Sequence, residues 1–154
     1  MTRPASSTDH PLAAACACGR LRRASRAITQ LYDDALAPSG LRITQFSLLR
    51  NLARGGTMRV TALAKTLLLD RTALSRTLDP LVLAGHVEIA RGRDARTREV
   101  SITRAGRAAL AAAQRPWKRA QADVTRRLGA AKLGGLIAAL AELETLHPDA
   151  ASRG

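Results

Sequence analysis

Aromatic residues and cysteines are scarce in this 154-residue chain, which has one Trp, one Tyr, one Phe and two Cys. So few rings are poorly suited to recognising single-stranded nucleic acid by base stacking. Two cysteines cannot build a disulfide scaffold for a chain of this length. No run approaches the roughly 18–20 apolar residues of a membrane span, and the first 11 residues carry charge and proline where a secretory signal has its apolar core. We therefore expect a cytoplasmic protein with no membrane partner.

Sequence signatures of catalysis are missing as well. The chain has no glycine-rich phosphate loop, no nucleophile elbow, no zinc-ligand spacing and no cluster of carboxylates. Its three histidines, His10, His86 and His147, are scattered and share no metal-ligand spacing. These absences predict a protein that is not an enzyme and that carries neither a metal nor a cofactor.

Positive charge is abundant instead. Lys and Arg number 25 against 12 for Asp and Glu, which gives a formal net charge of +13, and 22 of the 25 are arginines. A polyanion is therefore the first partner to consider. Apolar residues make up 46% of the chain, but 31 of them are alanines. The larger apolar side chains that remain are enough for only one or two small helical cores. Because heavy use of Arg and Ala can also follow from genomic base composition, the positions of the arginines must decide.

The N-terminal quarter predicts a leader followed by a helix. Residues 1–11 have the composition of a disordered leader. Residues 12–37 have apolar side chains at steps of three and four, and Pro38 follows directly. The stripe consists of Leu21, Ala24, Ile28, Leu31 and Ala35.

The C-terminal third predicts two more helices. Thr103 can cap a helix over residues 104–128, which Pro116 is expected to kink or break. A last helix is expected to end near Leu146, and residues 148–154 look like a frayed tail. The apolar stripes at the two ends of the chain would be exposed in a monomer, which indicates a two-fold dimer.

Three shorter helices are predicted in the middle of the chain from capping residues and apolar spacing. The third has two distinct faces, an apolar stripe and a polar one at positions i, i+3, i+4 and i+7. The expected N-caps are Thr44, Thr61 and Asp70, and the expected ends lie near Arg54, Leu68 and Ala84. The two stripes of the third helix are Leu74, Leu78 and Leu81, against Thr72, Ser75, Arg76 and Asp79.

After Gly85 the apolar period changes from 3.6 to 2, which predicts a β-hairpin with a basic tip. Val87 and Ile89 alternate with polar residues on the first strand, and Val100 and Ile102 do so on the second. A turn rich in Gly, Asp and Arg lies between them. The whole is therefore mainly helical with a small hairpin wing, the pattern of a winged helix-turn-helix.

The residues of this motif suit duplex DNA. Short polar and arginine side chains on the third helix fit the roughly 12 Å-wide major groove, where Arg76 could contact guanine. Arg71 and Ser75 are suited to phosphates. An arginine at the hairpin tip fits the negative potential of a narrow minor groove. The open alternatives are a basic winged helix that binds RNA or one that binds another protein.

The sequence resembles the MarR (multiple antibiotic resistance regulator) family. The likeness rests on Leu63-Ala64, residues 71–76 (RTALSR), Leu81, Gly85, Asp94-Ala-Arg96, Ile102-Thr103 and Gly106. It implies a triangular homodimer, with helices of residues 12–42 and 116–147 interdigitated and residues 43–115 as the DNA-binding lobe. It also implies transcriptional control, usually repression, through a pseudo-palindromic operator. By this likeness Asp94 bonds Arg96 and aims it into the minor groove, and the helix from Arg71 reads the major groove. Arg93 and Arg98 are either solvated charges or loose phosphate contacts. The candidate DNA-binding residues are therefore Arg71, Thr72, Ser75, Arg76, Arg93, Asp94, Arg96 and Arg98.

Two residues depart from what DNA recognition favours. Pro80 lies within the recognition helix, where it removes one backbone hydrogen bond and is expected to bend the second half. Asp79 lies on the DNA-facing stripe, where it would repel phosphate unless it accepts from a cytosine or pairs with Arg76. Both affect the choice of operator sequence more than DNA binding itself.

Two sets of residues are candidates for controlling such a regulator, one through a bound ligand and one through oxidation. The family resemblance implies a small, often aromatic ligand between the dimer helices and the lobe, for which Tyr32, Phe46 and Trp117 are candidates, although each also suits a core position. Cys16 and Cys18 are either small apolar residues at a helix start or a redox sensor, since a helix N-terminus favours thiolate. Two helical residues two apart point about 200° apart, so the pair is not expected to chelate a metal.

Overall fold

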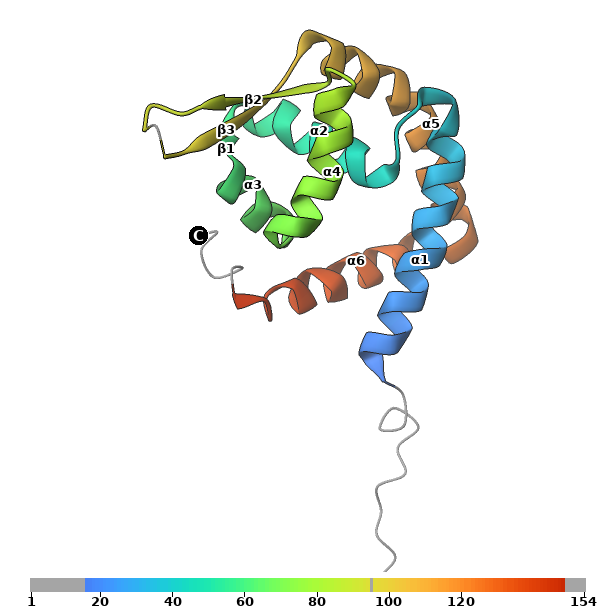
Figure 1. Cartoon of the computed structure of the whole chain (residues 1–154). Helices are drawn as coiled ribbons and strands as arrows, with labels where there is room; N and C mark the ends of the chain where they lie inside the picture. Colours follow the sequence, from blue (N-terminus) through green and yellow to red (C-terminus); the bar gives the residue numbers. More distant parts are fainter. Residues whose placement is uncertain (1–15, 95, 149–154) are drawn as a thin grey trace, which may run out of the picture.

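The computed structural model describes residues 16–94 and 96–148, and it is mainly helical with one small sheet (Figure 1). This architecture confirms the predicted fold class. The elements of the described chain are α1 (Ala17–Leu36), the 3-10 helix η1 (Ala37–Ser39), α2 (Ile43–Gly55), β1 (Met58–Arg59), α3 (Val60–Leu67), α4 (Arg71–Leu83), β2 (Val87–Arg91), β3 (Arg98–Ile102), α5 (Arg104–Leu128) and α6 (Ala130–Glu144).

The sheet has the strand order β1-β3-β2, and both pairings are antiparallel. Strands β2 and β3 form the predicted hairpin, in which Val87 pairs with Ile102 and Ile89 with Val100. Strand β1 was not predicted from the sequence. It has two residues, too few to show a period-2 pattern, and it exists because Met58 and Arg59 reach the free edge of β3.

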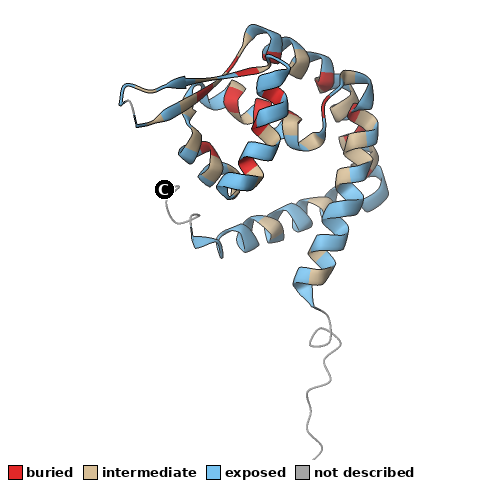
Figure 2. Ribbon diagram, viewed as in Figure 1, coloured by how far each residue is buried: buried red, intermediate tan, exposed pale blue. Residues whose placement is uncertain are grey.

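The hydrophobic core lies between the sheet and helices α2, α3 and α4 (Figure 2). The inward stripe predicted for α4 is confirmed, because all three leucines are buried. Strands β2 and β3 contribute their alternate residues from one face of the sheet. The fully or nearly fully buried side chains include Phe46, Leu48, Leu49, Leu52, Leu63, Leu74, Leu78, Leu81, Val87 and Val100. We call the unit formed by α2 to β3 the lobe.

Two of the predicted helix caps are confirmed, and two are wrong. Asp70 caps α4 and Thr103 caps α5. Helix α2 begins after Arg42 rather than at Thr44, because two other side chains satisfy its first N–H groups. Gln45 Oε1 accepts from the Arg42 N–H at 2.9 Å, and Asp33 Oδ1 of α1 accepts from the Ile43 N–H at 2.7 Å. Helix α3 likewise begins before Thr61, directly after strand β1 ends.

Helix α5 runs through Pro116 without interruption, so the break predicted at this proline does not occur. Packing on two sides explains this, because α5 contacts both α1 and α2. Ala113, Ala120 and Val124 are buried on its inner face, and the loss of one backbone hydrogen bond at proline is offset by this burial.

Helix α6 and the first half of α1 bury little within the chain. No residue of α6 is buried, and Figure 2 shows this helix exposed along its length. Gly129 adopts a φ of 82°, a left-handed conformation that separates α6 from α5. Among the described residues, no helix is long and apolar enough to cross a membrane.

A compact junction attaches the hairpin to α5. The Thr103 N–H donates to the His86 carbonyl at 3.0 Å, and the Thr103 hydroxyl donates to the Gly85 carbonyl at 2.6 Å. The same hydroxyl oxygen accepts from the Gly106 N–H at 3.0 Å. A Cβ added to Gly106 would clash with the His86 carbonyl oxygen. The Ile-Thr-x-x-Gly sequence therefore joins the end of α4, the hairpin and α5.

Gly106→Ala is expected to lower the free energy of unfolding by about 3 kcal/mol, because the clash is with a backbone atom that is itself hydrogen-bonded. The matched control is Gly19→Ala in α1, where the added Cβ meets its nearest atom at 3.8 Å and should stabilise its helix by up to about 1 kcal/mol. Urea unfolding at one fixed protein concentration measures both. Equal stability of the two variants would contradict this assignment.

Candidate nucleic-acid interface

Helix α4 presents a polar surface to solvent and is held firmly from behind. Thr72, Ser75 and Arg76 are exposed, as is Arg71 at the first helical position. Asp70 Oδ1 accepts a hydrogen bond from the Ala73 N–H at 2.7 Å, which fixes the start of the helix. Because the opposite face is buried in the core, the position of this surface relative to the lobe is set by packing.

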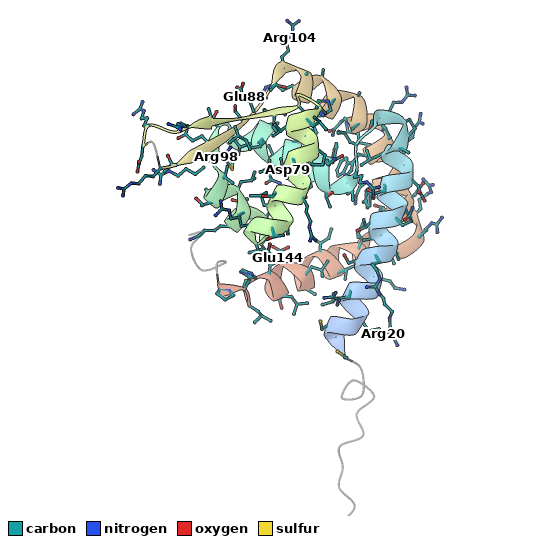
Figure 3. The ribbon with its side chains drawn as sticks, viewed as in Figure 1. Arg20, Asp79, Glu88, Arg98, Arg104 and Glu144 are labelled. Carbon is teal, nitrogen blue, oxygen red and sulfur yellow. The ribbon has the colours of Figure 1, made fainter. Side chains whose placement is uncertain are left out.

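The two departures noted on this helix have limited structural effect. Helix α4 continues through Pro80 to Leu83. Proline cannot donate to the Arg76 carbonyl, which is left without its usual intrahelical partner on the exposed side. Asp79 is exposed on the polar surface (Figure 3), and within the described chain it forms no ion pair with Arg76.

The tip of the hairpin is a turn organised by Asp94. Its Oδ1 accepts from the backbone N–H of Arg96 at 3.0 Å, and its carbonyl accepts from the Thr97 N–H at 2.8 Å. The Gly92 N–H donates to the Thr97 carbonyl at 3.0 Å and closes the turn. The side chain of Asp94 thus bonds Arg96, as the family resemblance implies, and it does so through the backbone N–H of Arg96.

Three arginines line an open hollow of about 410 Å³ on the hairpin. Two of them, Arg96 and Arg98, were singled out from the sequence, whereas Arg91 was missed. Only the strand register places Arg91 beside the others, because it pairs directly with Arg98. Arg93 is exposed at the turn but does not line the hollow.

The charge of this region is not neutralised internally. Residues 43–115 carry 13 Lys and Arg against five Asp and Glu, and so hold +8 of the formal +13. The ion pairs of the described chain are Arg42–Asp33 and Arg126–Asp123, both outside α4 and the hairpin. The arginines of α4 and of the hairpin are therefore available to an external anion.

The three aromatic candidates for a ligand site are engaged within the chain. Phe46 stacks on Trp117 with ring centroids 5.6 Å apart, and the guanidinium of Arg50 lies 4.7 Å above the Trp117 ring. Tyr32 donates its hydroxyl to Gln121 of α5 at 2.5 Å, and burial raises the pKa of this phenol. These contacts fasten α1 and α2 to α5, and Phe46 is part of the core.

The two cysteines lie at the start of α1 and are exposed free thiols. Cys16 is the N-cap, in an extended conformation, and its sulfur accepts from the Gly19 N–H at 3.4 Å. The 200° separation assumed for the pair applies to two helical residues and therefore does not apply to Cys16. Most of the predicted start of this helix, residues 12–15, lies outside the described residues.

Comparison with known proteins places this geometry among transcriptional regulators. The sequence model of the MarR family matches residues 39–97. The structure of the M. tuberculosis transcriptional regulator MosR in complex with DNA is 38% identical, with a TM-score of 0.76 over 86% of this chain and 98% of that one. A mutant of MarR from E. coli, complexed with operator DNA, is 26% identical, with a TM-score of 0.73 over 81% and 91%. No match was found among curated proteins.

Proposed function

Since this chain belongs to the MarR family of transcriptional regulators, we propose that it binds double-stranded DNA sequence-specifically, as a homodimer on a pseudo-palindromic operator. The observation that carries the proposal is that one lobe presents both an exposed polar face on α4 and hairpin arginines that have no acidic partner in the described chain. The DNA-bound MosR and the operator-bound MarR support it by analogy.

In this proposal α4 enters the major groove. Arg76 contacts the O6 and N7 of a guanine, and Thr72 contacts a neighbouring base edge. Arg71 and Ser75 bind phosphates and fix the register of the helix. The buried leucines on the other side of α4 hold the helix backbone in place, so that little backbone ordering is required at binding.

The hairpin enters the adjacent minor groove. Arg96 supplies the guanidinium that reads the narrow groove, while Asp94 shapes the turn through the Arg96 amide. Arg93 and Arg98 contribute phosphate contacts on either side. The direction of control is expected to be repression, which follows when a bound dimer blocks a promoter.

The apolar surface at the two ends of the chain supports the dimer. Large apolar side chains on α1, α5 and α6, and one just after α6, are 39–77% exposed, beyond what a soluble monomer usually tolerates as one patch. A second copy of the chain can bury them and set two α4 helices about one DNA turn, roughly 34–36 Å, apart. The residues are Ile28, Leu128, Leu136, Ile137, Leu143 and Leu146.

Of the two modes of control suggested by the sequence, oxidation of Cys16 and Cys18 has the stronger support. Both thiols are exposed, and the Cys16 sulfur is the N-cap of a helix that also supplies the Asp33 carboxylate to α2. Oxidation at this cap would therefore act on the helix that contacts the lobe. The aromatic residues proposed for a ligand are engaged in packing and hydrogen bonding instead.

The affinity of the protein for operator fragments, selected from genomic DNA on the purified dimer, is expected to fall about 10³-fold or more between 50 and 200 mM salt. Arg76→Ala should reduce discrimination at one base pair of each half-site by about 1–3 kcal/mol. Arg96→Ala should weaken binding most where the minor groove is narrow. Fluorescence anisotropy with matched and mismatched duplexes measures each effect.

Arg104→Ala is the control for both variants, because Arg104 points away from the hairpin (Figure 3). It should leave base discrimination unchanged. Affinity that does not depend on salt, or preference for structured RNA in direct competition, would refute the proposed function.

Sedimentation equilibrium is expected to give twice the 16.4 kDa mass of one chain. The double variant Leu136→Glu, Ile137→Glu should sediment as a single chain, because the dimer would have to bury four unpaired carboxylates. Leu83→Glu is the matched control, since Leu83 is 91% exposed but lies at the end of α4. A wild-type protein that sediments as one chain would contradict the proposed dimer.

Hydrogen peroxide is expected to lower operator affinity by about 5–150-fold, the usual range of coupling between two sites. The double variant Cys16→Ser, Cys18→Ser should bind like the reduced wild type, because the serine hydroxyl can replace the Cys16 sulfur as the acceptor at the N-cap. It should not respond to peroxide. An equal response of the two proteins would exclude the thiols as the sensor.

A further inference from the structure

Two arginines face each other across the outer end of the hairpin. Arg91 is the last residue of β2 and Arg98 the first of β3, and the antiparallel register pairs them directly. Directly opposed residues have Cβ atoms about 4.5–5.5 Å apart, which brings two guanidinium groups within reach of one small ligand. Both side chains are exposed, and both line the 410 Å³ hollow of the hairpin.

This pair lies on the face of the sheet that packs against the helices of the lobe. Alternation along the strands places Arg91 on the same side as Val87 and Ile89, and the cross-strand register places Arg98 on that side too. Val87 is buried in the core beside α4. The hairpin extends beyond the helices (Figure 1), so the two arginines occupy the position where this face leaves the core.

No acidic side chain offsets this juxtaposition in the described chain. Glu99 pairs with Ala90, and therefore lies on the other face of the sheet. The Oδ1 of Asp94 accepts from the Arg96 backbone, and neither Arg91 nor Arg98 forms an ion pair. Like charges directly opposite each other destabilise a hairpin. The free protein thus holds a local repulsion that an anion between the two guanidiniums would remove.

We propose that Arg91 and Arg98 together bind one phosphate of the DNA backbone, at the edge of the minor groove entered by Arg96. This inference rests on the proposed function and adds Arg91 to its binding residues. Two guanidiniums offer paired N–H donors to the two unesterified oxygens of a phosphodiester, in charge-assisted hydrogen bonds. Arg96 lines the same hollow, so fixing this phosphate also fixes the depth at which Arg96 enters the groove.

The sharing of one phosphate makes a distinctive prediction for Arg91→Gln, Arg98→Gln and the double variant. Each single variant should weaken operator binding about tenfold or more. The double variant should add little further loss, because the first substitution already disrupts the clamp, as we call the joint binding of one phosphate by Arg91 and Arg98. The slope of log affinity against log salt should become shallower by roughly 2, one phosphate on each of two wings at about 0.9 each. Thermal stability should stay equal or rise, since the cross-strand repulsion is relieved.

Operator duplexes with one neutral methylphosphonate at a time locate the phosphate. The wild type should lose affinity at one backbone position of each half-site beside the wing, and Arg91→Gln should show no further loss there. Arg104→Gln, which removes the same charge away from the hairpin (Figure 3), should change affinity less than about twofold. Circular dichroism confirms that each variant is folded.

Three results would overturn the inference. Additive losses in the double variant would assign the arginines to separate phosphates. Losses of operator affinity no larger than that of Arg104→Gln would show that Arg91 and Arg98 act only through long-range electrostatic attraction. A loss of thermal stability in step with affinity would indicate a structural role. If the wild type binds operator and any of these is found, the clamp alone fails, whereas a wild type that binds no duplex refutes the proposed function together with it.

Discussion

Burial of one face of α4 is the constraint on which the remaining structure depends. Leu74, Leu78 and Leu81 fix the helix against the sheet and α2, and their removal from water is worth about 1.5–3 kcal/mol each. A helix held in this way has no freedom to turn its polar face inward. That face is consequently presented at a fixed orientation relative to the hairpin, which the Thr103 and Gly106 junction anchors to the same lobe.

Positive charge is distributed on the lobe in a way that folding alone does not explain. Arginines are placed at the start of α4, at the hairpin tip and directly opposite each other across the strands, and none of them has an acidic partner in the described chain. Such an arrangement gains nothing for the free protein and costs some stability where like charges meet. An anion bound between such arginines would offset that cost.

The sequence predicted the elements of the lobe well where a local signal was strong. The stripe of α4, its Asp70 cap, the hairpin and the Thr103 cap all follow from residues within one or two turns of each other. The failures have non-local causes. The start of α2 depends on Asp33, ten residues away on α1, as well as on the nearby Gln45, and α5 stays intact at Pro116 because α1 and α2 pack against it. No pattern of neighbouring residues reports such contacts.

For the candidate site, the sequence by itself determined which side chains α4 and the hairpin present, because helical and strand periods decide the outward positions. Tertiary structure alone decided how those side chains combine. Strand register brought Arg91 beside Arg98, and the geometry of the turn directed the Asp94 carboxylate to the backbone N–H of Arg96. Periodicity is a property of one element, whereas register and turn geometry depend on two strands meeting, and that meeting is fixed by the burial of the shared core.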